Sequence, residues 1–411
     1  MTPAPLDLVG DVAPRVGRLR LPGVAPAGNG GIRELERDLE RHTAAEALDL
    51  TYADTKRWPA PEWALECFAS AARGAGPSYT AYRGDRQVRH VVAANVARFL
   101  GRSVDPDAEL ILTPGTQGAL FAVLATLIKP GDLVALPDPE YLASERTIRY
   151  CGGTVAPIPL LWEGQAAATL DFAALESAAE RGCRLVLLSH PNNPTGAVLT
   201  PDTVERIAKL AADHNMTVVV DELYARLLYG DIADFVHLGA LAGMRERSVT
   251  LLGPSKTESM SGYRVGVAVG PSWLIDGVED IQSVAALRAP AYAQHTLVPW
   301  LGDDHEFLDA RVDGYRKIRD WTVERLSHTD ILDVTPSAGT SYLFPRVVGV
   351  GADDHTVAKA LLRDANIVVN PGYQFGARGK GHFRICIAQD EAVWSDAVDR
   401  MITVLESMRA S

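Results

Sequence analysis

From residue 109 onward, short runs of apolar residues alternate with longer amphipathic segments. The runs have strand length and are rich in Val, Leu and Ile, whereas the segments between them show helical periodicity. Nearly continuous apolar strands that alternate with helices indicate an α/β fold, with a mostly parallel seven-stranded sheet covered by helices on both faces. The predicted strands are Glu109–Thr113, Leu133–Pro137, Thr154–Pro159, Leu185–Ser189, Thr217–Asp221, 248–252 and 265–269.

The segments outside this region predict three parts of the chain. We expect an N-terminal arm and helix (1–49) that packs with a small domain, a large domain (50–302), and a small C-terminal α+β domain (303–411). The segment Leu48–Pro61 contains several turn formers and is predicted as an extended loop. Helices are predicted over Ile32–Ala47, Glu62–Arg73 and Asp303–Leu326, and strands over Gly339–Phe344 and Phe383–Ile387.

Composition and charge narrow the classes of partner. A length of 411 residues favours two domains, and 40 basic against 52 acidic side chains give a net charge of −12. This charge argues against nucleic acid or an acidic membrane as partner, and leaves a small molecule. The four cysteines show no metal-ligand spacing, so reduced thiols and no metal site are expected. No apolar run reaches membrane-spanning length, and we expect a cytoplasmic protein.

Several polar residues follow directly on the predicted strands. Ligands of parallel sheets bind at the carboxyl ends of the strands. The turn Gly115–Gln117 opens a helix and suits an anion such as phosphate, although a simple β–α turn is the alternative. Tyr141 could stack on a flat ring or be an ordinary half-buried tyrosine. Asp221 ends an apolar strand, where it requires a cationic partner, such as a protonated ring nitrogen, or else caps a helix.

Lys256 stands between the apolar runs 248–252 and 265–269. Desolvation lowers the pKa of a lysine amine and makes it nucleophilic, which suits a Schiff base with a carbonyl compound. Arg264, eight residues further on, suits a phosphate because its planar fork binds that group through two hydrogen bonds. Taken alone, the segment could equally be a surface turn with a solvated lysine.

Four motifs in the same order give the chain a family resemblance. The chain resembles the class I/II aminotransferases in four motifs: PNNPTG (191–196), DELY (221–224), SK followed by an arginine eight residues after the lysine, and FRI (383–385). These aminotransferases are aspartate aminotransferase-like, fold-type I pyridoxal phosphate enzymes, and the resemblance runs from about Leu48 to the C-terminus. It implies pyridoxal 5′-phosphate as cofactor and a homodimer with shared active sites.

The resemblance also implies roles for individual residues. Lys256 would hold the cofactor as a Schiff base and shuttle a proton, and Asp221 would keep the pyridine nitrogen protonated. Asn193 and Tyr224 would hydrogen-bond the phenolic oxygen of the cofactor, and Asn193 would also lie at the substrate. The remaining roles are stacking by Tyr141, phosphate binding by Gly115, Thr116, Gln117, Ser255 and Arg264, phosphate binding across a dimer interface by Tyr79, and substrate α-carboxylate binding by Arg384.

Three departures from the family pattern leave the reaction open. Asp54 and Thr55 stand where the family usually has a glycine near the substrate carboxylate, Gly253 where many relatives carry a phosphate-binding serine, and Glu258 where an apolar residue is common. These changes are either drift or signs of a remodelled pocket. Lys56, Arg57 and Glu258 are candidates for contacting the substrate side chain.

The leading hypothesis is an aminotransferase that acts on an α-amino acid. The alternative is another pyridoxal phosphate reaction on the same scaffold: β- or γ-elimination or replacement, cyclisation, or oxygen-dependent oxidation. A non-catalytic binding protein that kept the fold is a third class. The presence of Lys256, Asp221 and Arg384 argues against this third class, because a binding protein has no physical need for all three.

Overall fold

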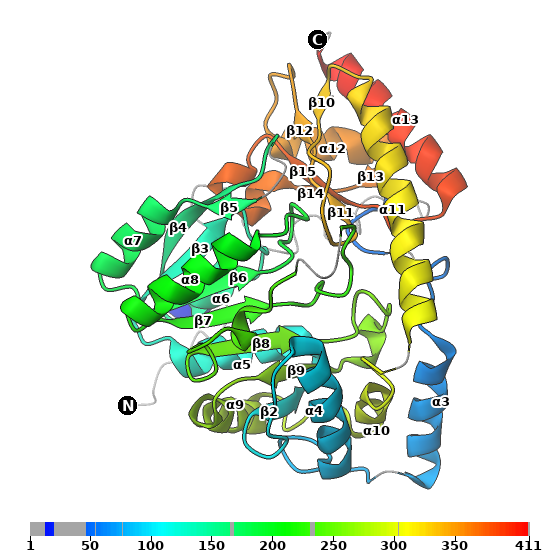
Figure 1. Ribbon diagram of the computed structural model, residues 1–411. Helices are drawn as coiled ribbons and strands as arrows, with labels where there is room; N and C mark the ends of the chain where they lie inside the picture. Colours follow the sequence, from blue (N-terminus) through cyan, green and yellow to red (C-terminus); the bar gives the residue numbers. More distant parts are fainter. Residues whose placement is uncertain are drawn as a thin grey trace, which may run out of the picture.

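The computed structural model describes residues 13–19, 47–53, 55–75, 77–164, 168–230, 235–302 and 304–409. The predicted helix Ile32–Ala47 lies outside these ranges except for its last residue. Figure 1 shows a larger part built around one sheet and a smaller part above it, with the long helix α11 (His305–Ser327) beside both.

An eight-stranded sheet forms the centre of the larger part. Its order is β2-β9-β8-β7-β6-β3-β4-β5, and β8, β7, β6, β3 and β4 are mutually parallel, whereas β9 and β5 run antiparallel to their neighbours. All seven predicted strands are present, and β5 was missed because two residues show no periodicity. The bounds are β2 Leu110–Thr113, β3 Leu133–Asp138, β4 Thr154–Leu161, β5 Thr169–Leu170, β6 Leu185–Ser189, β7 Thr217–Asp221, β8 Ser248–Leu252 and β9 Gly266–Val269.

Helices cover both faces of this sheet, as predicted. Successive residues of β6 show the reason: Leu185 and Leu187 belong to the core that includes α5 and α9, whereas Val186 and Leu188 belong to the core that includes α7 and α8. Because side chains alternate across a strand, a strand that is apolar at every position requires apolar cover on both sides. The helices of this part are α3 Glu62–Ser70, α4 Arg86–Leu100, α5 Gly115–Leu127, α6 Ser144–Tyr150, α7 Phe172–Glu180, α8 Pro201–Asp213, α9 Ser272–Ala285 and α10 Ala291–Gln294.

The smaller part has its own core around Tyr315, Phe383 and Trp394. Its strands pair as β11-β15-β14 and β10-β12, and β1 of the N-terminal segment joins it by pairing with β13. The domain boundaries after residues 49 and 302 stay predictions. The elements are β1 Leu48–Asp49, β10 Leu332–Asp333, β11 Tyr342–Leu343, β12 Arg346–Val347, α12 Asp354–Ala365, β13 Ile367–Val368, β14 Asn370–Pro371, β15 Phe383–Cys386 and α13 Glu391–Arg409.

Short helical segments complete the architecture. They are α1 Pro14–Gly17, η1 Ala71–Ala75, η3 Leu238–Ala240, η4 Ser261–Tyr263, η5 His295–Leu297, η6 Gly372–Phe375 and η7 Ala377–Gly379.

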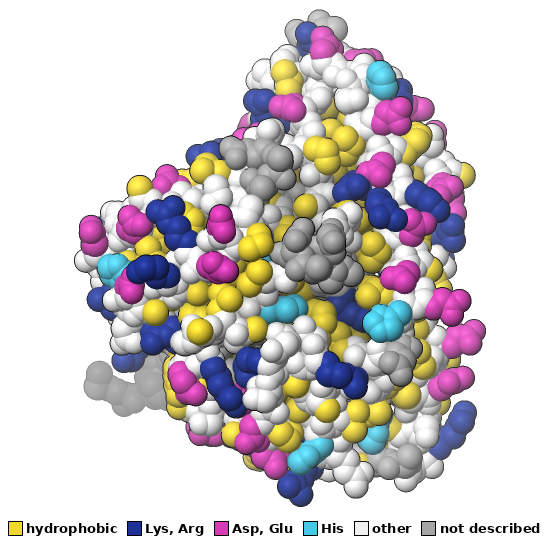
Figure 2. All heavy atoms as spheres, in the orientation of Figure 1, with side chains coloured by type: hydrophobic (Ala, Val, Ile, Leu, Met, Phe, Trp, Pro, Cys, Tyr) yellow, Lys and Arg dark blue, Asp and Glu magenta, His cyan; other side chains and the backbone are white. Residues whose placement is uncertain are grey.

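Acidic and basic side chains are interspersed over the face shown in Figure 2. Such mixing is typical of a surface without a large field of one sign. Within the described ranges, no helix combines the length and the apolar character needed to cross a membrane.

Candidate active site

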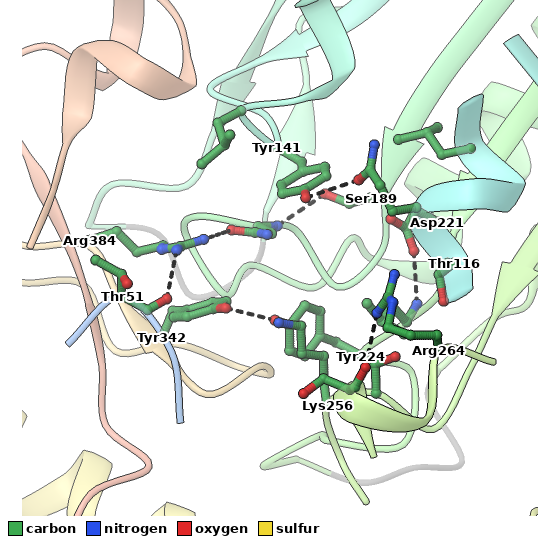
Figure 3. A pocket seen from close by; sticks show the side chains of 17 residues that line it. Thr51, Thr116, Tyr141, Ser189, Asp221, Tyr224, Lys256, Arg264, Tyr342 and Arg384 are labelled. Carbon is green, nitrogen blue, oxygen red and sulfur yellow. Dashed lines mark hydrogen bonds between the residues drawn. The ribbon is translucent and has the colours of Figure 1, made fainter. Parts of the chain in front are cut away.

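A cavity of about 310 Å³ lies at the carboxyl ends of the parallel strands, between the two parts of the chain. This volume is at the lower end of the range for small-molecule pockets, roughly 300–1,000 Å³. Figure 3 shows its polar side chains converging from both parts. Of the residues predicted from the sequence, Thr116, Gln117, Tyr141, Asn193, Asp221, Tyr224, Ser255, Lys256, Arg264 and Arg384 line it.

The end of the cavity beside α5 is suited to an anion. Gly115 begins this helix with φ +77°, a conformation that favours glycine, and a Cβ there would lie 2.6 Å from the guanidinium of Arg264. The first N–H groups of α5 have no side-chain cap among the described residues. Together with the Arg264 guanidinium they form a positively polarised cradle beside Thr116 and Ser255.

The structure explains why residue 253 is a glycine. A Cβ at Gly253 would lie 2.6 Å from the hydroxyl oxygen of Thr116. The Thr116 hydroxyl therefore occupies the space into which a side chain at position 253 would extend. Thr116 of α5 therefore supplies a hydroxyl at this end of the pocket, in addition to that of Ser255 in the loop after β8.

Asp221 lies at the floor of the pocket, at the end of β7 (Figure 3). Burial raises the pKa of its carboxyl to about 6, and Glu222 acts in the same direction, whereas the N–H of Leu223 (3.1 Å) and the charge of Lys256 lower it. Residues 223–226 form turns, so the alternative that Asp221 caps a helix is wrong. A buried carboxylate with a raised pKa is stabilised by a cationic donor placed in the cavity.

Tyr141 forms one wall of the pocket. It is half-buried and its hydroxyl donates to Oε1 of Gln117 at 3.0 Å. Burial raises the pKa of Tyr141 to about 12, so this hydroxyl remains a donor at neutral pH. The contact fixes the orientation of the ring over the cavity.

Beneath the pocket, the carboxylate of Glu140 organises the loop that carries Asn193. Glu140 is buried and accepts hydrogen bonds from the N–H (2.9 Å) and hydroxyl of Ser189 and from the N–H of Tyr141 (2.7 Å). The Ser189 hydroxyl in turn accepts the N–H of Asn193 at 3.0 Å. The sequence analysis did not identify Glu140, although a carboxylate directly after an apolar strand was an available signal.

Stability is expected to fall as pH rises through the titration of Glu140. Burial raises the pKa of this carboxyl from 4.5 to about 7. Between these values the folded protein holds a proton that the unfolded chain has lost, so the free energy of unfolding decreases with pH by roughly 3 kcal/mol. Urea unfolding between pH 5 and 8 should show a flatter dependence in Glu140→Gln. Glu180→Gln, at an exposed position, is the control; equal slopes in wild type and Glu140→Gln would contradict the prediction.

Arg384, on β15, enters the pocket from the smaller part of the chain (Figure 3). Its two terminal nitrogens donate to Oδ1 of Asn193 (2.8 Å), to Oδ1 of Asn370 (2.7 Å) and to the carbonyl of Thr51 (3.1 Å). Among the described residues, its buried Nε has no hydrogen-bond partner. A carboxylate in the cavity could satisfy this donor. Asn370 and Thr51 were not identified from the sequence, because each meets Arg384 only in the folded chain.

Tyr224 and Tyr342 meet beside Lys256 (Figure 3). Their hydroxyl oxygens are 2.9 Å apart and both side chains are buried. Burial raises the pKa of Tyr224 well above its usual value. Tyr342 was predicted only as part of a strand, since the sequence Gly339–Phe344 carries no spacing that marks a pocket residue. The other lining residues missed from the sequence are Leu120, Leu142, Ser189, Leu223 and Ser261.

The predicted substrate-binding residues of the segment after β1 need correction. Thr55, Lys56 and Arg57 are exposed and are not among the residues that line the pocket in the described part of the chain. Asp54 lies outside the described residues. The segment contributes Thr51 instead, because the pairing of β1 with β13 brings Thr51 next to Arg384.

Glu258, a candidate for contacting the substrate side chain, is not among the residues that line the pocket in the described part of the chain. Its side chain is 1% exposed and forms an ion pair with Arg226, which also bonds Asp304 at 2.6 Å. The next residue, Ser259, accepts from Arg311 of α11 at 2.7 Å. A carboxylate buried this deeply requires a cation, and Arg226 supplies one. The loop that carries Lys256 is therefore anchored by Arg226 and Arg311 on the side away from the cavity. Glu258 adds no acid–base group to the cavity.

Removing the shared cation of this cluster is expected to cost more than removing one of its carboxylates. Arg226→Met leaves two buried carboxylates facing each other and should lower the free energy of unfolding by about 3–5 kcal/mol. Glu258→Gln keeps the pair of Arg226 with Asp304 and should cost about 1–3 kcal/mol. Lys209→Met, which removes an exposed ion pair on α8, is the control. Urea unfolding followed by circular dichroism measures the free energy of unfolding of all three variants. If Arg226→Met lowers it no more than the control does, Arg226 does not hold the two carboxylates together.

Tyr79 lies outside the pocket. Its side chain is 71% exposed, and the guanidinium of Arg288 stacks over its ring at 4.8 Å. An exposed tyrosine paired with an arginine is typical of contact surfaces.

Comparisons with known proteins agree with this geometry. A sequence model of the family described as aminotransferase class I and II matches residues 49–401. The putative aminotransferase YugH of Bacillus subtilis is 32% identical over 325 residues, which cover 79% of this chain and 83% of that protein. Aromatic-amino-acid aminotransferase 2 of Thermococcus litoralis is 29% identical over 333 residues, covering 80% and 85%. The crystal structure of an aspartate aminotransferase from Rhodobacter sphaeroides is similar with a TM-score of 0.85 and 35% identity, covering 88% and 94%.

Proposed function

Because the chain belongs to the class I and II aminotransferase family, we propose that it moves the amino group of an α-amino acid to a keto acid, with pyridoxal 5′-phosphate bonded covalently to Lys256. The observation that carries the proposal is the convergence of Lys256, Asp221 and Arg384 on one cavity. Each of them supplies a different requirement: a nucleophilic amine, an acceptor for a ring N–H, and a site for a carboxylate.

The residues present fit this cofactor. The N-terminus of α5, with Gly115 against Arg264, forms a cradle for a phosphate. Asp221 lies at the floor of the same cavity, where its carboxylate can accept the N–H of a protonated ring nitrogen. Tyr141 can pack against the ring, with its own orientation fixed by Gln117.

When bound, pyridoxal phosphate supplies an electron sink for the bond that breaks at the substrate Cα. Asp221 would keep the ring nitrogen protonated, so that the ring withdraws electrons. Asn193 and Tyr224 would donate to the phenolic oxygen; the oxygen of the Asn193 amide is engaged by Arg384, which leaves its NH₂ group as the donor. Thr116, Ser255 and Arg264, which line the cavity, would hold the phosphate.

Lys256 also moves the proton of the reaction. Its amine lines the cavity, where it would lie within reach of a substrate Cα. A positioned amine that takes a proton from Cα and returns it elsewhere is general acid–base catalysis, worth about 10²–10⁴ in rate. Arg384 holds the α-carboxylate through its fork and so orients the Cα–H bond toward this amine.

The reaction is tested by incubating purified protein and cofactor with a panel of α-amino acids, with and without pyruvate or 2-oxoglutarate. The expected result is formation of the new amino acid and keto acid only when an acceptor is present. Ammonia release or oxygen uptake without an acceptor would contradict transamination and favour elimination or oxidation. Of the residues whose polar groups suggested those reactions, Thr55 and Glu258 are not among the lining residues in the described part of the chain.

The assembly is proposed to be a homodimer with shared sites. Tyr79 and Tyr82 are exposed and both rings lie against Arg288, so a second copy could receive Tyr79 at its phosphate cradle. Tyr79→Phe should weaken cofactor affinity about tenfold by loss of one hydrogen bond to a charged group, without changing the dimer mass measured by light scattering. A wild-type protein that is a monomer by light scattering and binds the cofactor as tightly as Tyr79→Phe does would contradict the shared site.

A further inference from the structure

Tyr342 contacts two residues with different proposed roles: Tyr224, assigned to the phenolic oxygen of the cofactor, and Arg384, assigned to the substrate α-carboxylate. It lies on β11, which pairs antiparallel with β15 so that Tyr342 is opposite Cys386. Arg384 is two residues from Cys386 and therefore projects from the same face of this sheet as Tyr342. The Tyr342 ring lies 4.0 Å from the guanidinium of Arg384, and its hydroxyl lies 2.9 Å from that of Tyr224.

We propose that Tyr342 is a further positioning residue for the reaction, which acts through both neighbours: its hydroxyl donates to Tyr224, and its ring supports Arg384. The inference rests on the proposed function. One side chain, Tyr342, would then link the site that binds the phenolic oxygen of the cofactor to the site that binds the substrate carboxylate.

In the structure the Tyr224 hydroxyl donates to that of Tyr342. Each phenol has one proton to donate. With the cofactor bound, Tyr224 would give its proton to the phenolic oxygen, so both hydroxyls would turn and the proton between the two tyrosines would come from Tyr342. A hydroxyl that accepts a hydrogen bond becomes a stronger donor, by about 10–30%. Tyr342 therefore strengthens the bond that Tyr224 makes.

The surroundings of the pair favour this arrangement. Tyr224 is 3% exposed, so loss of the Tyr342 proton would leave its oxygen a buried acceptor without a donor. The titratable and charged groups that act on it are Tyr342 itself and, from β15, the thiol of Cys386 and the guanidinium of Arg384. Lys256 and Asp221 line the same cavity. Arg384 is the cation among the groups that act on Tyr224, and it favours a polarised hydroxyl.

The ring of Tyr342 has a separate role. Asn193, Asn370 and the Thr51 carbonyl bond the terminal nitrogens of Arg384, but these contacts lie in the plane of the guanidinium. The face of the guanidinium rests on the Tyr342 ring, a cation–π contact in a desolvated place. This contact prevents the planar group from tilting.

Two variants separate the hydroxyl from the ring. Tyr342→Phe keeps the ring and should raise the pH midpoint of the visible absorption band of the bound cofactor by about 0.1–0.7 pH unit. The reason is that a weaker hydrogen bond on the phenolic oxygen leaves more negative charge beside the nitrogen contributed by Lys256. The KM for the amino acid should stay within about twofold of wild type. Tyr342→Leu should in addition raise this KM by about 5- to 30-fold through loss of the cation–π contact.

Matched controls make the test specific. Tyr229→Phe removes another buried tyrosine hydroxyl, which bonds the Thr340 carbonyl outside the pocket, and should leave the midpoint unchanged. In a Tyr224→Phe background, Tyr342→Phe should cause no further shift, because its effect passes through Tyr224.

The outcomes distinguish the inference from the function on which it rests. An intact absorption band with the same midpoint in wild type and Tyr342→Phe would overturn the hydroxyl role. An unchanged KM in Tyr342→Leu would overturn the role of the ring. A wild-type protein that forms no visible band with pyridoxal phosphate would overturn the proposed function, and this inference with it.

Discussion

Lys256→Ala is expected to eliminate the visible absorption band of the bound cofactor and nearly all amino transfer. In the proposed function the amine of Lys256 is the nucleophile of the cavity, and the cradle around Gly115 and Arg264 would still hold the phosphate. Loss of the proton transfer at Cα alone should lower the rate by about 10²–10⁴. Absorption spectra and single-turnover rates of the variant measure the two effects separately.

Borohydride reduction followed by peptide mapping identifies the lysine that carries the cofactor. In the wild-type protein the reduced cofactor should be found on the peptide that contains Lys256. Lys317→Ala, an exposed position on α11 paired with Asp313, should retain the band and the label. Cofactor bonded to a different lysine in the wild-type protein would show that the assignment of Lys256 is wrong.

Arg384→Ala is expected to lower kcat/KM for amino acids by roughly 10²–10⁴-fold, which corresponds to about 3–5 kcal/mol of transition-state stabilisation. The variant loses the charge and both hydrogen bonds to the α-carboxylate. It also leaves the Oδ1 atoms of Asn193 and Asn370 without their donor. The absorption band of the bound cofactor should persist, because Lys256, Asp221 and the phosphate cradle are unchanged.

A conservative series isolates the contribution of geometry. Arg384→Lys keeps the charge without the fork and should fall between wild type and Arg384→Ala. Asn370→Ala removes one anchor of the guanidinium and should cost about tenfold, one charged hydrogen bond. A primary amine without a carboxylate should react at similar rates in all of these proteins. If the amino acid and the amine lose activity equally, Arg384 does not bind the carboxylate.

The fold of the larger part was predictable because its strands are apolar at every position. Leu185, Val186, Leu187 and Leu188 required apolar cover on both faces, and alternating helical segments were available to provide it. β5 was missed because its two residues pair with the end of β4 only after the chain has folded. Periodicity is a local property, and an element of two residues has none.

The site was predictable to the extent that local spacing determines it. The end of an apolar strand placed Asp221, the segment between β8 and β9 placed Lys256 and Arg264, and all three line one cavity. Arg384, 128 positions after Lys256, was assigned through the family resemblance, and the structure brings it to the same cavity. The roles of these residues are tested by the variants described above.

The sequence by itself placed Asp221, Lys256 and Arg264 at or after the ends of apolar strands, because strand ends and their spacings are local features of the chain. Only the tertiary structure decided what surrounds them. Glu258 is close to Lys256 in sequence, yet it turns away to Arg226 and Asp304, because burial of a carboxylate requires a cation that lies 32 residues away. Tyr342 meets Tyr224 across 118 residues, and Asn193 meets Arg384 across 191. Such contacts depend on how β11 and β15 register and on how the two parts of the chain pack. No local pattern of apolar and polar positions contains that information.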